Sequence, residues 1–563
     1  MILGIFIRNF KVYGKTTFIP LANGDHFTGL IGDNGVGKTT VLQALDCFFN
    51  DSDWIFDILL PPNKIKPLIQ PVFLVPKEKI PAATQTEAEA VSDELWQHRA
   101  DIKIHSRKKY LRQFHDLLAG LPGQINSDTH YLLTAGITKS HRPCSGVFPP
   151  ETTGSPHIWI KLLKTLYRYI YIPTSPVPVD VMKLADPEMR QAVNQETERL
   201  CRSLYDTETA ELLNSSEKLQ LIILLLRYIL DNDKKTQYLI GFDEPEATLQ
   251  TSVCYDLFEK IYLLARNNAQ VVLTSHWYGF IPLLTAGLLV NILLEEDRHK
   301  FLRFDISRFR EEIKIRKRIY MEKYREELPV DVSLKSVNDF IQSLIGSVIN
   351  KPFYNWLICE GSSEKIYFNY YFEEEIKNNR IRIVPVGGVR EVKKIYNYLS
   401  IPFQDLKDYI QGNIVLLTDT DIQLLEFDTP AIEHLYCFRL VNYRGGTELV
   451  HIKSNPKSPA TEIEDVLNGK AFHEALLSFK EEFPHLLDFV TPEEKPQIPS
   501  YYAMDLTPTQ YEKMISFFDA NIHNKVRFAH KYIEICRRGG YEVPDWIKRI
   551  KTILCNDPTA CKY

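Results

Sequence analysis

Three features are absent from this sequence: cysteines paired at C-x-x-C spacing, a membrane-length apolar run and an excess of basic residues. The spacing of the nine cysteines argues against a disulfide framework or a zinc ribbon and favours a reducing cytosol. The most apolar run, Leu219 to Leu230, is shorter than a bilayer span, and the opening MILGIFIRNFKVYG lacks the layout of a signal peptide. We therefore expect a cytoplasmic protein without a membrane partner.

The balance of charge excludes one class of nucleic-acid binder. Lys and Arg number 67 against 72 Asp and Glu, which gives a formal net charge of −5 over 563 residues. A protein that coats nucleic acid through overall positive charge is therefore excluded, whereas an enzyme with local basic grooves is not. Basic residues cluster at 103–112, 308–318 and 537–551, and a solvated helix face is the simpler interpretation of each cluster.

The apolar pattern predicts an α/β protein built from several folding units. Strands are predicted at 2–7 and 27–31, and a helix at 40–49. Residues 51–155 are rich in Pro, Thr, Gln and His, which suggests a mostly helical insertion into the first domain. A charged helical stretch at 305–327 is a plausible linker to a second α/β pattern. The predicted domains are 1–50 with 156–320, the insertion 51–155, the second α/β domain 350–450 and a helical region 451–563.

The first chemical motif is a glycine-rich loop between a strand and a helix. Gly32-Asp33-Asn34-Gly35-Val36-Gly37-Lys38-Thr39 matches the P-loop pattern, in which backbone N–H groups surround phosphate oxygens at a helix N-terminus. In such a loop Lys38 reaches the terminal phosphates and the Thr39 hydroxyl binds Mg²⁺. A chance glycine-rich loop is the alternative, but the strand-loop-helix context disfavours it. The predicted ATP-binding residues are Gly32, Asn34, Gly35, Gly37, Lys38, Thr39 and Thr40.

Two later strands end in residues that complete a nucleotide site. Tyr238 to Phe242 is an apolar strand followed by Asp243, a candidate Mg²⁺ ligand, and Glu244, a candidate to polarise the attacking water. Leu273-Thr274-Ser275 is followed by His276, a candidate phosphate sensor. By itself, such a histidine is more often a structural one.

These pieces, in this order, resemble the ABC-type ATPase heads of the RecF, SMC and OLD group. The resemblance implies heads that close as dimers around ATP, with a signature loop from one head capping the nucleotide of the other. The matching stretch, Leu213-Asn214-Ser215-Ser216-Glu217-Lys218, lacks the glycines of the usual Leu-Ser-Gly-Gly pattern. We therefore expect ATP to act mainly as a clamp rather than as a rapidly hydrolysed substrate.

A second motif places carboxylates at the ends of three predicted strands. Glu360 and Glu364 follow the strand from Trp356, Gly387-Gly388 follows a strand at 381–386, and Asp419 and Asp421 follow a strand at 414–417. The carboxyl ends of parallel strands meet at one edge of a sheet, and carboxylates suit Mg²⁺ or Mn²⁺. Acids that cap helix N-termini are the alternative interpretation.

The order Glu-Gly-x-x-Glu, Gly-Gly, Asp-x-Asp resembles the TOPRIM domain. That resemblance implies divalent-metal phosphodiester chemistry, with Glu364 and Asp419 on one metal and Glu360 and Asp421 on a shared or second one. Within the OLD proteins it also implies a later acid, here Glu464, and a lysine, here Lys525, for the transition-state phosphate. A capped helix start at Thr461 and an exposed helix lysine explain these last two residues equally well.

An ABC-type head followed by TOPRIM resembles the OLD (overcoming lysogenization defect) family of nucleases. The resemblance implies an ATP-regulated, metal-dependent DNA endonuclease of homodimeric or higher assembly, serving in anti-phage defence. As in retron effectors, a reverse transcriptase with its small DNA–RNA hybrid, or another defence partner, would hold it inactive. Two alternatives stay open: a non-cleaving repair clamp of RecF or SMC character, and a topoisomerase- or primase-like enzyme.

Overall fold

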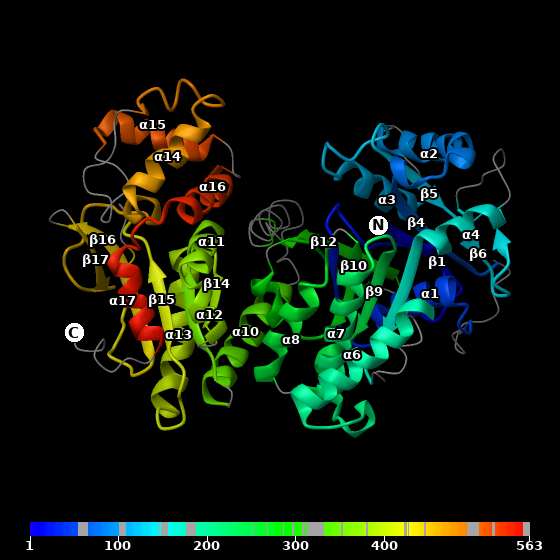
Figure 1. Cartoon of the computed structure of the whole chain (residues 1–563), viewed down its shortest axis with the longest axis horizontal. Coiled ribbons are helices and arrows are strands. Elements are labelled where there is room, and N and C mark those ends of the chain that lie inside the picture. Colours follow the sequence, from blue (N-terminus) through cyan, green and yellow to red (C-terminus); the bar gives the residue numbers. More distant parts are fainter. Residues whose placement is uncertain are drawn as a thin grey trace. The chain divides into compact units, whose positions relative to one another are not determined.

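The computed structural model of the chain divides into two compact units, Met1–Val337 and Asn338–Tyr563 (Figure 1). The charged stretch predicted as a linker lies almost entirely outside the described residues, as do most of the basic positions at 103–112 and 308–318. The structure describes residues 1–54, 66–100, 108–144, 146–147, 156–175, 187–249, 251–266, 268–284, 286–295, 298–306, 309, 312, 331–350, 353–378, 381–421, 425, 427–443, 446–492, 506–520 and 524–555.

The first unit contains an antiparallel sheet in the order β2-β1-β4-β6-β7, with β5 paired to β4. Two helices, α2 (Gln85–Ala100) and α3 (Lys109–Ala119), pack against β5 and β2 respectively. The apolar faces of this sheet and of α3 meet in a core that includes Phe6, Phe18 and Phe114. The strands are β1 (Ile2–Arg8), β2 (Thr17–Pro20), β4 (Leu68–Pro76), β5 (His130–Thr134), β6 (Gly136–Ile137) and β7 (Pro143–Cys144).

The segment predicted as a mostly helical insertion, residues 51–155, contains helices α2 and α3 but also contributes to this sheet. The segment supplies four of the six strands, and β4 pairs with β1 from Ile2↔Phe73 to Arg8↔Leu68. The apolar run of β4 contains Pro71, and proline within a run normally argues against an interior strand. Because β4 and β1 share one sheet, residues 51–155 do not form a body separate from the first 50 residues.

The second sheet of the first unit is mostly parallel, in the order β12-β11-β3-β10-β9-β8. Strands β3, β9 and β10 are buried along nearly their whole length, which explains why they appear in the sequence as continuous apolar runs. The predicted strands at 27–31, 238–242 and 271–274 are confirmed here. The strands are β3 (Phe27–Ile31), β8 (Tyr167–Ile172), β9 (Gln237–Asp243), β10 (Ala269–Ser275), β11 (Leu288–Glu295) and β12 (Arg298–Asp305).

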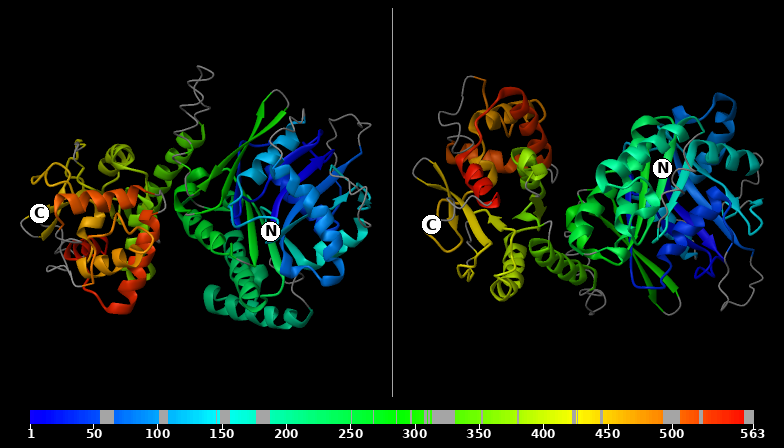
Figure 2. Two further views of the ribbon diagram at one scale, coloured as in Figure 1. Left: turned by 90° about the horizontal axis from the view of Figure 1, so that it is seen from above. Right: turned by 60° about the horizontal axis from the view of Figure 1, so that its bottom comes forward.

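Helices pack against this parallel sheet (Figure 2). Helix α1 contacts β8, β9 and β10, which places the loop that precedes α1 at the carboxyl edge of the sheet. Helix α7 begins at a capping box, in which the Asn214 side chain and the Glu217 side chain each accept the other residue's backbone N–H. The helices of this part are α1 (Lys38–Asn50), α4 (Pro156–Leu166), α6 (Pro187–Tyr205), α7 (Ser215–Asn232) and α8 (Thr251–Tyr262).

The second unit is built on a sheet in the order β14-β13-β15-β16-β17. Four of its strands are parallel and β17 is antiparallel, so the three strands predicted from the sequence share one carboxyl edge. Helix α10 (Asp331–Ile349) spans the boundary between the two units. The strands are β13 (Asn355–Cys359), β14 (Ile381–Pro385), β15 (Ile414–Thr418), β16 (Leu435–Tyr443) and β17 (Gly446–His451).

The predicted helical character of residues 451–563 is confirmed. Helices α14, α15 and α16 pack together with α11 and lie side by side in Figure 2, while α17 contacts β13, β15 and β17. The eight cysteines that the structure describes are free, and none of the described helices is long and apolar enough to cross a bilayer. The helices are α11 (Ser362–Tyr371), α12 (Glu373–Asn378), α13 (Val389–Asp405), α14 (Gly469–Phe479), α15 (Pro508–Asp519), α16 (Asn524–Gly539) and α17 (Asp545–Leu554).

Candidate functional site

The glycine-rich loop joins β3 to α1, as the sequence predicts. Gly32 and Gly37 have φ values of 147° and 99°, which non-glycine residues rarely adopt. A Cβ atom at Gly32 would lie 2.4 Å from the Ile292 carbonyl oxygen, and one at Gly37 would lie 2.7 Å from Val12. Gly35, by contrast, would meet nothing within 4 Å. The loop is therefore packed at both ends and open at its tip, where Asn34 is also exposed.

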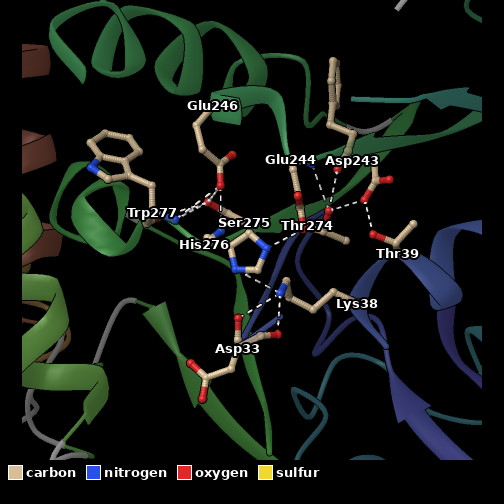
Figure 3. Close-up of polar contacts among 12 residues, drawn as sticks. Asp33, Lys38, Thr39, Asp243, Glu244, Glu246, Thr274, Ser275, His276 and Trp277 are labelled. Atoms are coloured by element: carbon tan, nitrogen blue, oxygen red, sulfur yellow. Dashed lines mark hydrogen bonds and ion pairs between the residues drawn. The ribbon is translucent and has the colours of Figure 1, made fainter. Parts of the chain in front are cut away.

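Lys38 is buried inside this loop (Figure 3). Its ammonium donates to the carbonyl oxygens of Gly32 at 2.8 Å and Asp33 at 2.9 Å. Burial lowers the pKa of Lys38, although the carboxylates of Glu244 and Glu246 oppose that shift. A cation held by neutral carbonyl groups is a ready counterion for a phosphate entering the loop.

Asp243 is the last residue of β9 and lies beside the first turn of α1 (Figure 3). Its Oδ1 accepts hydrogen bonds from Thr39 at 2.8 Å and from Thr274 at 2.7 Å. Its Oδ2 accepts from the Tyr171 hydroxyl at 3.0 Å. The pairing of Thr39 with Asp243 brings together the two oxygen ligands predicted for Mg²⁺. The sequence motif does not indicate Tyr171 or Thr274. The one feature of the sequence that could have indicated them is their position near the ends of apolar strands.

Glu244 and His276 meet across the ends of β9 and β10. The Nε2 atom of His276 lies 2.5 Å from the Glu244 carboxylate, and its Nδ1 lies 3.2 Å from the Lys38 ammonium. Because Lys38 can only donate and Glu244 accepts, this geometry matches a neutral imidazole with its proton on Nε2. His276 thus connects Lys38, the lysine predicted to bind phosphate, to the acid predicted to polarise water.

Two further predicted segments have structural explanations. Thr40 lies in the first turn of α1 and is buried. The stretch matched to the signature loop forms the exposed capping box of α7, which gives Asn214 and Glu217 a structural role. The sequence did not indicate Glu246, whose Oε1 accepts from the backbone N–H groups of His276 and Trp277 and so supports the turn that carries His276.

In the second unit, Glu360 lies at the centre of the predicted carboxylate edge. Its side chain accepts the Asp419 backbone N–H at 2.9 Å, and its carbonyl oxygen accepts those of Gly387 at 2.6 Å and Gly388 at 3.1 Å. The Glu-Gly, Gly-Gly and Asp-x-Asp segments therefore meet. Glu360 also accepts from the Val389 N–H at the start of α13, so the alternative interpretation as a helix cap describes part of its role.

Glu364 and Asp419 face the same region. Glu364 sits in the first turn of α11, is only 3% exposed and caps that helix by accepting the Gly361 N–H. Burial, together with the carboxylate of Glu360, raises the pKa of Glu364 well above its usual value. Burial and the carboxylates of Glu364 and Glu360 do the same to the pKa of Asp419. Asp421 is exposed, and its charge helps to raise the pKa of Glu360.

Glu464 and Lys525 join this cluster from distant parts of the chain. Glu464 is 2% exposed, which argues against the exposed helix start left open by the sequence. The Lys525 ammonium lies 2.8 Å from Glu462 and 3.8 Å from Glu464. Although burial opposes its charged form, the carboxylates of Glu464 and Glu462 keep the pKa of Lys525 above its usual value.

The acidic cluster consists of Glu360, Glu364, Asp419 and Glu464. It has more carboxyl groups than Lys525 alone can balance. Burial raises the pKa of Glu360 to about 7, because a buried carboxylate favours its neutral form. Asp419 Oδ1 and Glu464 Oε1 are buried without a hydrogen-bond partner among the described residues. Oxygen donors left unsatisfied in this way suit a hard divalent cation. Within the described ranges, however, no three acidic, His or Cys side chains are already arranged as metal ligands.

A buried arginine that the sequence did not indicate lies behind the Asp-x-Asp loop and binds Thr420. Arg439 on β16 is 0% exposed and donates to Thr420 Oγ1 at 3.1 Å and to the carbonyl oxygens of Ile452 at 3.3 Å and Pro456 at 2.6 Å. Thr420 lies between Asp419 and Asp421, and its backbone pairs with Thr461 by two hydrogen bonds of 3.0 and 2.8 Å. Arg439 therefore joins the Asp-x-Asp loop to the loop at 452–456, while the Thr420–Thr461 pair joins it to the segment that leads to Glu464.

Comparison with known proteins identifies the first unit's chemistry. Residues 1–115 match the family model described as an AAA ATPase domain. The matched range includes both β1 and β4, which share one sheet. The first unit therefore carries an ATPase domain, for which ATP and Mg²⁺ are the expected ligands. No curated protein matches the chain.

Solved structures give only distant likenesses. The SMC head domain from Thermotoga maritima shows 12% identity and a TM-score of 0.29, covering 54% of this chain and 98% of its own. An SMC head with an extended coiled coil from Pyrococcus furiosus, bound to a domain of ScpA, shows 10% identity and a TM-score of 0.33, covering 58% and 99%. At these values the likeness carries no argument about function.

Replacement of Lys38 by alanine should remove ATP binding. The ammonium is the cation buried within the loop, and a lost charge-assisted bond to phosphate costs about 1.5–3 kcal/mol for each contact. We expect ATP affinity, measured by isothermal titration calorimetry, to fall by about 100-fold or below detection. Lys15→Ala removes an exposed lysine and should leave it unchanged. Equal affinity in both variants would contradict the ATP site.

Without divalent metal, the second unit should lose stability as the pH rises. The folded Glu360 has a pKa of about 7 and the unfolded residue about 4.5, so the folded chain binds more protons between these values. The free energy of unfolding must therefore fall as the pH rises through this window. Metal bound by the carboxylates should offset this loss. At a metal concentration of roughly 100 times the Kd, binding adds about 2.7 kcal/mol to the free energy of unfolding.

Scanning calorimetry at about pH 5.5 and about pH 8, with and without Mg²⁺ or Mn²⁺, measures this effect. We expect a rise in Tm of roughly 5–10 °C with metal at the higher pH and little change at the lower one. Glu464→Gln should reduce the rise, whereas Glu448→Gln, which alters an exposed acid on β17, should not. A metal effect of equal size at both pH values would argue against the carboxylate site.

Arg439→Leu should destabilise the second unit. It leaves several buried oxygen acceptors without a donor, which costs about 3 kcal/mol or more. For a unit of this size the corresponding fall in Tm is roughly 6–12 °C. Arg390→Leu changes an exposed arginine of α13 and serves as the matched control. If the two variants have the same Tm, Arg439 does not hold the Asp-x-Asp loop in place.

Proposed function

We propose that this protein is an ATP-regulated, divalent-metal-dependent DNA endonuclease, with nuclease chemistry of TOPRIM type in residues 350–450 completed by residues 451–563. The observation that carries the proposal is the convergence of Glu360, Glu364, Asp419 and Glu464 at one edge of a parallel sheet, with two of their oxygens unsatisfied. Buried like charges of this kind must take up protons or a cation, and near neutral pH a divalent cation meets the need.

Each residue of this edge has a place in the proposed reaction. Glu364, Asp419 and Glu464 supply the buried oxygen ligands, and Glu360 orients Asp419 through its backbone N–H. The exposed Asp421 adds a ligand on the solvent side, where DNA approaches. A divalent ion held by these carboxylates would supply an activated water and positive charge for the scissile phosphate. Lys525 turns from its carboxylate partners toward the developing phosphate charge.

The ATPase domain supplies the regulation. In our proposal the loop from Gly32 to Thr40 holds the phosphates of ATP, while Thr39 and Asp243 hold Mg²⁺. Glu244 polarises water, and His276 reports the nucleotide state through its contacts with Lys38 and Glu244. Nucleotide binding draws Lys38 away from its carbonyl partners and so changes the contacts of His276. The protein would act as a homodimer or higher assembly. Its setting in anti-phage defence, with a reverse transcriptase or another partner, rests on the OLD resemblance alone.

A second candidate is a non-cleaving, DNA-bound ATPase clamp. Two observations favour it: the family match covers only the ATPase domain, and no three ligand-type side chains in the described part of the chain are already set around a metal position. This candidate predicts ATP-dependent DNA binding that does not respond to changes in the carboxylate cluster.

Supercoiled plasmid DNA incubated with Mg²⁺ or Mn²⁺, with and without ATP, separates the two candidates. For a nuclease we expect nicked or linear product, reduced about 100-fold or more in Asp419→Asn because the activated water is lost. Glu448→Gln should cut normally, and Lys38→Ala should cut without responding to ATP. ATP-dependent binding of DNA without any cut, unchanged in Asp419→Asn, would establish the clamp instead.

A further inference from the structure

The first unit contains a basic pocket that neither the ATPase assignment nor the proposed nuclease uses. It is a largely open depression with a volume of about 590 Å³. It lies where the end of α1, the turn before β7 and helix α4 come together, and its lining includes Asp51, Arg142, Lys161 and Lys164. These residues come from three segments that are distant in the sequence, so the pocket is formed only by the fold.

The lining carries an excess of positive charge in a chain whose net charge is −5. Lys164 pairs with Asp51 at 2.9 Å, so these two charges balance each other. Arg142 and Lys161 are exposed, and their side chains make no hydrogen bond or ion pair with any residue that the structure describes. Two unbalanced cations therefore face the same pocket, where an anion would find them without first breaking an existing pair.

The walls of the pocket are shaped by unusual backbone. Asp51 and His141 have φ values of 55° and 54°, in the left-handed region that residues other than glycine seldom occupy. The His141 Nε2 donates to the Ser52 carbonyl oxygen at 3.0 Å, which ties the turn before β7 to the end of α1. This hydrogen bond holds Arg142, the residue after His141, beside the pocket. Strained backbone such as that of Asp51 and His141 is frequent at binding sites.

One part of the pocket lining is apolar and is formed by Pro143 and Ile160. We propose that this pocket binds the 5′-phosphate of a nucleotide, with Arg142 and Lys161 on the phosphate and the apolar side against the sugar or base. The planar guanidinium of arginine suits bidentate contact with phosphate oxygens, and lysine adds a point charge. The nucleotide is either free or the terminal residue of a nucleic-acid strand, since both present the same chemistry.

This site is distinct from the P-loop because the two lie at opposite ends of α1. The helix begins at Lys38 and ends at Asn50, next to Asp51. Its 13 residues span about 20 Å at 1.5 Å per residue. Binding at one end can therefore be measured while the other is disabled, and the two sites share a rigid element through which occupancy of one can influence the other.

The test measures binding to the full chain carrying Lys38→Ala, without divalent metal, so that neither ATP-site binding nor cleavage contributes. Three probes are compared by isothermal titration calorimetry: 5′-dAMP, a short 5′-phosphorylated single strand, and the same strand with a 5′-hydroxyl. Arg142→Gln with Lys161→Gln should weaken binding of the phosphorylated probe by about tenfold or more. It should also reduce the dependence of log affinity on log salt by roughly 1–2 units.

Arg202→Gln with Lys235→Gln makes the same charge change at two exposed positions outside the pocket and should leave affinity unchanged. Comparable binding of 5′-dAMP and the phosphorylated strand identifies a free-nucleotide site, and preference for the strand identifies a strand-end site. Equal binding of the 5′-hydroxyl strand, equal loss in both double variants, or no binding of any probe would overturn the proposal. These outcomes are independent of cleavage, so they do not depend on the nuclease proposal.

Discussion

Parallel strands that end side by side are the constraint on which both candidate sites depend. In the first unit β10 runs beside β9, so Thr274 stands opposite Asp243 and the next residues bring His276 to Glu244. In the second unit β13 lies between β14 and β15, which carries Glu360 to Gly387 on one side and to Asp419 on the other. Parallel pairing aligns the carboxyl ends of strands, and so it gathers residues that are far apart along the chain.

The two sites balance buried charge in different ways. Lys38 is surrounded by carbonyl oxygens and an imidazole, and the nearby acids Glu244 and Glu246 only partly oppose the lowering of its pKa by burial. Around Asp419 several acids raise one another's pKa, and Lys525 forms ion pairs with Glu462 and Glu464. One site therefore favours an incoming anion and the other an incoming cation. The net charge of −5 predicts neither the preference for an anion nor the preference for a cation, because each depends on the charges close to the site.

Several residues of the two candidate sites also have a structural role. Glu360 and Glu364 cap helices α13 and α11, and Glu246 supports the turn that presents His276. An acid that caps a helix can therefore also be a functional group. A cap fixes the position of a carboxylate on rigid backbone, and that fixed position is what ligand binding requires.

The sequence by itself determined the local chemistry: the P-loop at Gly32–Thr39, the apolar strands that end at Asp243 and Ser275, and the acids that follow β13 and β15. These signals are local because glycine, buried strands and terminal carboxylates act within a few residues of each other. Only the tertiary structure decided that 51–155 shares a sheet with β1, that Tyr171 binds Asp243, and that Arg439 joins Thr420 to the loop at 452–456. It also formed the basic pocket from Asp51, Arg142 and Lys161. Such contacts depend on strand order and on the burial of distant side chains, which no local pattern specifies.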